Sequence, residues 1–157
     1  MRAMPLEGRS FVTALQSLAT RLQDGDAPRV VVHVDGVERD IPPAIAGDLV
    51  LVAQEAVVNA KRHAAATIID IIAVFADASV GVVIQDDGQG FDTSLRADSG
   101  EKHFGIDGME DRIRRLGGTL TVDSRLGAGA TITAHVPSSA AVAEPSTPLV
   151  VASRSAV

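Results

Sequence analysis

The stretch QEAVVNAKRHA, residues 54–64, lies inside the longest helical pattern of the sequence, which runs from residue 42 to about residue 65. Its apolar residues recur three and four positions apart, as on the buried face of an amphipathic helix. Glu55, Asn59 and Arg62 stand at positions i, i+4 and i+7. At about 100° per residue, these three side chains share one narrow face of the helix. This stripe is typical either of a solvated helix surface or of one wall of a polar site.

The segments on either side of this helix predict a small mixed sheet. The β-branched runs Thr67–Phe75 and Val80–Gln85 indicate two strands joined by a short antiparallel connection. Val30–Val34, followed by the turn signal Asp35-Gly36, predicts a small hairpin or two edge strands. Further strands are expected at residues 120–123 and 130–136, and further helices at residues 11–22 and 109–116. The order of these elements predicts an α+β layer fold, with helices on one face of a mixed sheet.

A second polar cluster follows the strand predicted at residues 80–85. The segment IQDDGQGFD, residues 84–92, ends that strand in two carboxylates and continues as Gly88-Gln89-Gly90. Glycine lets the backbone approach a ligand closely and adopt a positive φ angle. Asp86 is placed at the strand end to accept a hydrogen bond from an exocyclic amine. The alternative is a plain acidic turn, because Asp-Gly is a common turn dipeptide.

Two further glycine-bearing segments complete the set of candidate site residues. Gly105 and Gly108 precede the short helix of HFGIDGMEDRIRRLGG, residues 103–118, whose first turn would offer free N–H groups to an anion. A flexible loop before a helix is the alternative interpretation. Thr131 follows the turn Gly127-Ala128-Gly129, from which its hydroxyl could reach a phosphate or remain an ordinary strand side chain.

Composition excludes several classes of protein. The chain of 157 residues has a formal net charge of −6, four Phe and no Trp or Tyr, which argues against nucleic acid as a partner. Cysteine is absent, so disulfides and Cys-ligated metal centres are excluded. Charged or polar residues interrupt every apolar run before it reaches the length of a membrane span, and the N-terminus does not resemble a signal peptide. We therefore expect a cytoplasmic domain with no direct membrane contact.

In this order and at these separations, the four segments resemble the N, G1 and G2 boxes and the Gly-Thr element of the ATP-binding fold shared by histidine kinases, DNA gyrase, Hsp90 and MutL. The resemblance covers about residues 45–137, and QEAVVNAKRHA and GMEDRIRRLGG look most like sensor histidine kinases of the NarX/DesK type. It implies the Bergerat ATP-binding fold, an α+β two-layer sandwich. Its sheet is mixed but mostly antiparallel, and its helices lie on one face.

The resemblance also implies roles for individual residues, with ATP and Mg²⁺ as cofactors. Glu55 looks like the acid that polarises the reacting group or its water, and Asn59 like the amide that coordinates Mg²⁺, which makes both catalytic. Asp86 looks like the aspartate that receives the adenine amino group. The other nucleotide-binding positions that it implies are Arg62, His63, Gly88, Gly90, Gly105, Gly108, Met109 and Thr131. Ala130 stands where many relatives carry the threonine of a Gly-Thr pair, so the hydroxyl moves to Thr131.

The function implied is transfer of the ATP γ-phosphate to a histidine for two-component signalling. None of the four histidines is followed by an acidic residue, as the acceptor of such kinases is. The implied partners are therefore a dimerisation domain that carries the acceptor histidine and a response regulator downstream. A stand-alone anti-sigma-factor-type serine kinase and an ATP-responsive switch without transfer are the alternatives.

The resemblance and the composition together predict three segments. Residues 1–25 are expected to connect to a dimerisation domain, residues 26–137 to form the catalytic domain, and residues 138–157 to be a disordered tail. The polar segment Thr93–Phe104, which carries Arg96, Lys102 and His103, is expected to be a lid that orders on ATP binding.

Overall fold

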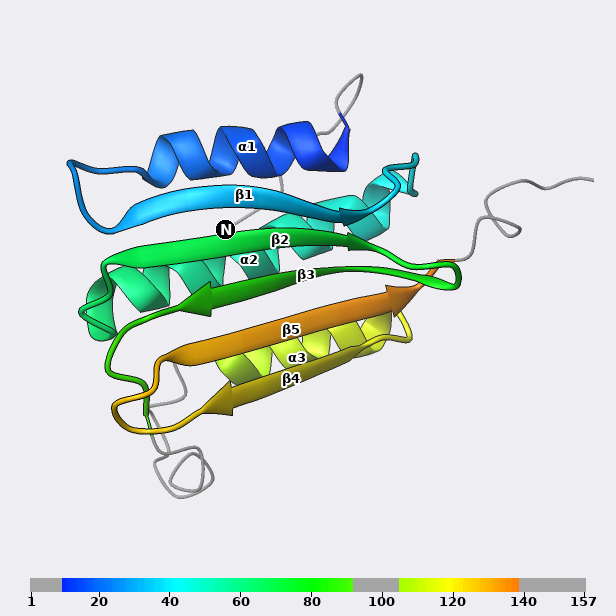
Figure 1. Ribbon diagram of the computed structural model, residues 1–157. Helices are drawn as coiled ribbons and strands as arrows, with labels where there is room; N and C mark the ends of the chain where they lie inside the picture. The colour runs from blue at the N-terminus through cyan, green and yellow to red at the C-terminus, as the bar shows by residue number, and fades with distance from the viewer. Residues whose placement is uncertain (1–9, 92–104, 139–157) are drawn as a thin grey trace, which may run out of the picture.

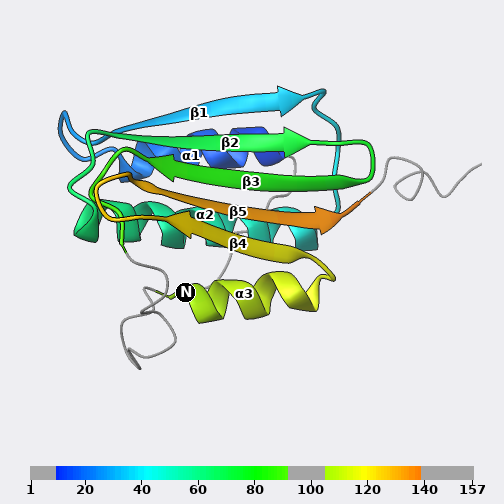
Figure 2. The same ribbon diagram turned by 60° about the horizontal axis from the view of Figure 1, so that its bottom comes forward.

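The five strands described below form one sheet in the order β1-β2-β3-β5-β4, and helices cover one of its faces (Figures 1 and 2). This computed structural model describes residues 10–91 and 105–138. The elements are α1 (Phe11–Leu22), β1 (Arg29–Gly36), α2 (Pro43–His63), β2 (Ile68–Phe75), β3 (Ser79–Asp86), α3 (Ile106–Arg115), β4 (Thr119–Ser124) and β5 (Ala130–Pro137). β1 pairs with β2 in parallel, and every other pair is antiparallel. The predicted α+β fold with a mixed, mostly antiparallel sheet is confirmed.

The core lies between the sheet and the helices, where the sequence patterns predicted it. Alternate residues of β2, from Ile69 to Phe75, are buried against the helices, while the residues between them are only partly covered. On α2, Leu49, Val52 and Val57 have no exposed surface. α2 is long and apolar enough to cross a membrane by length and composition, but here 44% of its most apolar window is buried in the protein. Burying an aliphatic side chain stabilises the fold by about 1.5–3 kcal/mol, so these two faces hold the layers together.

Helix α1 shares this core. Leu15 and Leu18 are fully buried, and the ring of Phe11 meets Phe75 of β2 edge to face at 6.2 Å between centroids. At its C-terminal end, Lys61 Nζ of α2 donates a hydrogen bond of 2.7 Å to the Leu22 carbonyl oxygen. α1 is therefore packed as part of the same folded unit as the sheet. Its role as a connector to a dimerisation domain stays a prediction.

Of the small hairpin or two edge strands predicted within residues 30–41, the hairpin is wrong and one edge strand is present. β1 is one strand that runs to Gly36, and residues 37–42 form no strand. The Asp35-Gly36 signal marks the end of β1, because Gly36 has a φ of 97° and a Cβ atom there would lie 2.2 Å from the Phe75 carbonyl oxygen. Parallel pairing with β2 therefore replaces a hairpin at this edge of the sheet.

Helix α3 begins at Ile106, three residues before the predicted start at residue 109. Gly105 provides its N-terminal cap with a φ of 73°, and Ile106 is buried. The predicted stop at Gly117-Gly118 is confirmed, since Gly118 N donates to the Ile113 carbonyl and Gly117 N to the Arg114 carbonyl, both at 2.9 Å. The predicted lid, residues 93–104, and the predicted tail beyond residue 138 lie outside the described residues.

Candidate functional site

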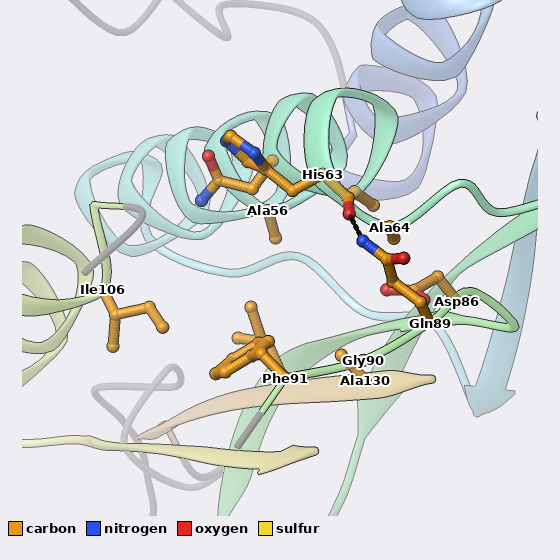
Figure 3. Close-up of a pocket in the computed structure, with 12 residues that line it drawn as sticks. Ala56, His63, Ala64, Asp86, Gln89, Gly90, Phe91, Ile106 and Ala130 are labelled. Atoms are coloured by element: carbon orange, nitrogen blue, oxygen red, sulfur yellow. Dashed lines mark hydrogen bonds between the residues drawn. The ribbon is translucent and has the colours of Figure 1, made fainter. Parts of the chain in front are cut away.

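A cavity of about 230 Å³ lies between the C-terminal half of α2 and the ends of β3 and β5 (Figure 3). The lining residues are Ala56, Asn59, Ala60, His63, Ala64, Asp86, Gln89, Gly90, Phe91, Ile106, Ala130 and Ile132. Four of them were candidates from the sequence: Asn59, His63, Asp86 and Gly90. The structure therefore brings the polar face of the long helix and the glycine-bearing turn after β3 to one cavity.

The two adjacent carboxylates at the end of β3 have different environments. Asp86 lines the cavity and is half-buried, and its Oδ1 accepts a hydrogen bond of 2.8 Å from Gly88 N. Desolvation by burial raises the pKa of Asp86, against the lowering effect of backbone hydrogen bonds from Gly88 and Ala130. Its carboxyl group thus faces the cavity with capacity for another hydrogen bond.

Asp87, by contrast, holds the start of β2. Its carboxylate accepts hydrogen bonds from the Thr67 hydroxyl, from Thr67 N at 2.8 Å and from Ile68 N at 3.1 Å. The bond from the Thr67 side chain is the largest cause that lowers the pKa of Asp87. Of the two carboxylates, only Asp86 belongs to the cavity, and Asp87 fixes the chain around it.

The turn after β3 is fastened to the end of α2. Gln89 N donates to the Ala64 carbonyl at 2.7 Å. Gln89 Nε2 donates to the His63 carbonyl at 2.6 Å, the bond that is dashed in Figure 3. A Cβ atom at Gly88 would lie 2.2 Å from the Ala64 carbonyl oxygen, so only glycine permits this approach. Gly88 therefore allows the turn to lie against the end of α2. The sequence reasoning missed Gln89, although its place between two glycines marks a residue whose backbone and side chain can both contact a neighbouring element.

The turn between β4 and β5 packs against the other side of the turn that follows β3. Gly127 N donates to the Gln89 carbonyl at 2.6 Å, and Phe91 N donates to Ser124 Oγ at 2.8 Å. A Cβ atom at Gly90, whose φ is 64°, would lie 2.1 Å from the Arg125 carbonyl oxygen. The glycines on both sides thus allow two chain segments to run in contact beside the cavity.

Thr131 does not belong to the cavity. Its neighbours on β5, Ala130 and Ile132, both line it, and successive side chains of a strand point to opposite faces of the sheet. The Thr131 hydroxyl therefore lies on the face away from the helices. The position next to Asp86 is taken by Ala130, whose methyl group adds an apolar contact in place of a hydroxyl.

Glu55 lies outside the cavity wall, next to the start of α3. A Cβ atom added to Gly105 would be only 2.6 Å from Glu55 Oε2, so the two residues are in close contact. Gly108 is exposed and has open space around it, with nothing within 4 Å of an added Cβ atom. Arg62 is exposed on α2 and does not line the cavity. Of these positions, Glu55 and Gly105 lie together at the start of α3.

Met109 is part of the core. It is 3% exposed and packs in the apolar cluster between α3 and the sheet, so its side chain does not line the cavity. Sequence reasoning missed the apolar walls formed by Phe91, Ile106 and Ile132. Ile132 carried a readable signal, since it lies in a predicted strand; Ile106 did not, because the helix was predicted to start at residue 109.

The site combines apolar walls with a small number of polar groups. Phe91, Ile106 and Ile132 offer flat or aliphatic surface, and Asp86 and Asn59 offer a carboxylate and an amide. Such a pocket fits a planar heterocycle whose exocyclic amine donates to the carboxylate. Glu55 and the start of α3 lie just outside the pocket, where they could contact a polar group attached to that heterocycle.

The comparisons with known proteins agree with this geometry. The family model "Histidine kinase-, DNA gyrase B-, and HSP90-like ATPase" matches residues 44–140. The chain is 29% identical over 140 residues to the signal transduction histidine-protein kinase/phosphatase DegS of Bacillus subtilis, covering 87% of this chain and 36% of DegS. It is 29% identical over 127 residues to the nitrate/nitrite sensor protein NarQ of Escherichia coli, covering 80% of this chain and 22% of NarQ. The chain thus spans well under half the length of these relatives.

Solved structures of similar fold include catalytic domains. The ATP-binding domain of PrrB from Mycobacterium tuberculosis aligns with a TM-score of 0.63 and 22% identity, covering 88% of this chain and 98% of that domain. The histidine kinase domain of a blue-light activated kinase from Erythrobacter litoralis aligns with a TM-score of 0.60 and 21% identity, covering 85% of this chain and 61% of that one. These likenesses establish the fold.

Proposed function

Because the chain belongs to the family of histidine kinase-, DNA gyrase B- and HSP90-like ATPases, we propose that it is the ATP-binding catalytic domain of a sensor histidine kinase. Membership implies that the domain binds nucleotide. The observation that carries the finer assignment is the half-buried Asp86 carboxyl at the cavity, between apolar walls that fit a planar base. An adenine amino group would donate to this carboxylate, whereas guanine would present a carbonyl oxygen to it.

The residues at the α3 side of the cavity suit the phosphates and Mg²⁺. Mg²⁺ keeps several waters and binds through few protein oxygens together with substrate phosphates. The described residues offer no group of three or more metal-ligating His, Cys, Asp or Glu side chains, which fits a cation held mainly by ATP. We assign the Asn59 amide oxygen as the protein ligand, with Arg62 and His63 near the phosphates and Gly88 and Gly90 shaping the base pocket. Bound Mg²⁺ would neutralise phosphate charge.

In the proposed reaction a histidine nitrogen attacks the γ-phosphorus, the bond to the β,γ-bridging oxygen breaks, and ADP leaves. Phosphoryl transfer needs mainly positioning and electrostatic stabilisation. We assign to Glu55, which lies beside Gly105, the polarisation of the attacking group. We propose that the acceptor histidine lies on a dimerisation domain reached through residues 1–25, that a response regulator receives the phosphoryl group, and that the domain works in the cytoplasm. Gly105 and Gly108 border the phosphates in this arrangement.

Two measurements test the proposal. Titration with ATP and GTP in the presence of Mg²⁺ should give at least about fivefold weaker binding of GTP, because an unpaired buried carboxylate costs about 1–3 kcal/mol. Asp86→Asn should remove that preference. Equal affinity for the two nucleotides would contradict the assignment of Asp86. Incubation with labelled ATP and a histidine-bearing dimerisation domain should label histidine, and acid-stable label on serine would contradict the histidine kinase assignment.

A further inference from the structure

Two arginines of α3 make ion pairs of almost the same length but of different kinds. Arg112 Nη1 lies 2.9 Å from Asp48 Oδ1 on α2, and these side chains are 34% and 27% exposed. Arg114 Nη1 lies 2.8 Å from Asp111 Oδ1, but both residues belong to α3 and their side chains are 70% and 55% exposed. Arg112 therefore connects two helices in a partly buried position, whereas Arg114 forms an exposed pair within a single helix.

Asp48 extends the polar stripe of α2 toward its N-terminus. It precedes Glu55 by seven residues, which places it about two turns away on the same face of the helix. Seven residues also separate Gly105 from Arg112 on α3. Asp48 meets Arg112 at one end of this face, and Glu55 meets Gly105 at the other. The two helices thus run antiparallel, with an ion pair at one end of the span and a close approach of Glu55 to Gly105 at the other.

The apolar contacts of α3 do not fix this register alone. Met109 is 3% exposed and Ile113 has no exposed surface, and both pack in the core. This packing holds α3 against the core, but the hydrophobic effect behind it is non-directional. An ion pair with a defined N–O contact is directional and fixes the position along the helix axis.

We infer that Asp48 and Arg112 form a positioning pair for the nucleotide site. The pair sets α3 along α2 so that Ile106 stays in the cavity wall and Gly105 stays against Glu55. This inference rests on the proposed function, because it assigns the pair to the nucleotide cavity. Neither Asp48 nor Arg112 lines that cavity, so both act through α3.

The test compares Arg112→Gln and Asp48→Asn with Arg114→Gln as the matched control. ATP affinity is measured by calorimetry at a temperature where every variant is folded. Arg112→Gln and Asp48→Asn should each weaken ATP binding on the order of fivefold, the lower end of couplings between sites. The double variant should be no weaker than either single variant, since both remove the same contact. Arg114→Gln should bind ATP as the wild type does.

A conservative variant and a second readout separate positioning from general destabilisation. Arg112→Lys keeps a cation for the single Asp48 contact and should restore most of the ATP affinity. Amide hydrogen exchange across α3 without nucleotide should be faster in Arg112→Gln than in Arg114→Gln, and this readout does not depend on ATP. A thermal midpoint that falls together with ATP affinity, with no rescue by lysine, would indicate a merely structural role and overturn the inference.

The remaining outcomes also decide the question. If Arg112→Gln weakens ATP binding and Asp48→Asn does not, Arg112 acts on the nucleotide directly and the pair has no positioning role. If neither variant differs from Arg114→Gln in affinity or exchange, the inference is wrong. If the wild type fails to bind ATP, the proposed function fails. In that case, faster amide exchange of α3 in both Arg112→Gln and Asp48→Asn than in Arg114→Gln would still support the role of the pair in setting α3 along α2. Unchanged exchange would refute that role.

Discussion

Replacing Gly105 or Gly108 by alanine should change the stability of the domain in opposite directions. Gly105 has a φ of 73° and caps α3, and an added Cβ atom would lie 2.6 Å from Glu55 Oε2. Gly108 lies within α3, is exposed, and has nothing within 4 Å of an added Cβ atom. The two glycines are three residues apart, so the same substitution tests backbone conformation and space separately.

The magnitudes follow from these two environments. The left-handed region costs an L-residue about 1–2 kcal/mol, so Gly105→Ala should destabilise the domain by this amount. The contact with Glu55 adds little to stability, because the end of an exposed flexible side chain can move aside, but this movement displaces the proposed catalytic carboxylate. Gly108→Ala removes the entropic cost of glycine in a helix and should stabilise the domain by about 0.5 kcal/mol. The two variants should therefore differ by about 2 kcal/mol.

Chemical denaturation monitored by circular dichroism measures both effects. At about 2–8 °C per kcal/mol, the difference should also appear as clearly separated thermal midpoints. Glu55→Ala combined with Gly105→Ala should leave the backbone cost and remove the steric contact. Equal stability of Gly105→Ala and the wild type would refute the reasoning on backbone strain. If phosphates occupy the space beside Gly108, Gly108→Ala should bind ATP more weakly although it is more stable.

The remaining predictions concern the two adjacent carboxylates and the amide. Burial raises the pKa of Asp86 above 3.8, so its contribution to stability is present below that value and is lost as the pH rises through the folded-state pKa. Asp86→Asn should therefore stabilise the nucleotide-free protein at pH 7, and a loss of stability in denaturant titrations would contradict this sign. The pKa of Asp87 is lowered below 3.8, so its contribution is present above that value and is lost as the pH falls through the folded-state pKa. Asp87→Ala should lower stability at pH 7 and have less effect at pH 3, whereas an equal loss at both pH values would show that charge is not the cause. Asn59→Ala should abolish the increase in ATP affinity on adding Mg²⁺ and stop phosphoryl transfer, while metal-free nucleotide binding persists. Full transfer activity would show that Asn59 does not hold Mg²⁺.

Local patterns were enough to predict most of the elements. The three-and-four spacing on α2 and the alternation on β2 and β3 report which side chains become buried, and burial is what stabilises each element. The hairpin expected before α2 failed because a turn signal marks the end of a strand and does not say what pairs with it. β1 pairs with β2, which comes later in the chain.

The candidate site divides in the same way. The sequence by itself determined that Asn59 lies on a polar helix face and that Asp86 ends a strand beside two glycines. Only the tertiary structure separated Asp86, which faces the cavity, from Asp87, which holds Thr67. The side chains of adjacent residues at a strand end point to opposite faces of the sheet. Which face borders the cavity depends on the helix that covers the sheet.

The same reason applies to contacts between distant segments. Ile106 and Ile132 form cavity walls, Thr131 turns away from the cavity, and Arg112 reaches Asp48 across 64 positions of sequence. Periodicity determines which face of each element is apolar, because burial depends on the direction of each side chain. It does not determine strand order or the register of one helix along another, since these depend on packing that forms only when all the layers meet.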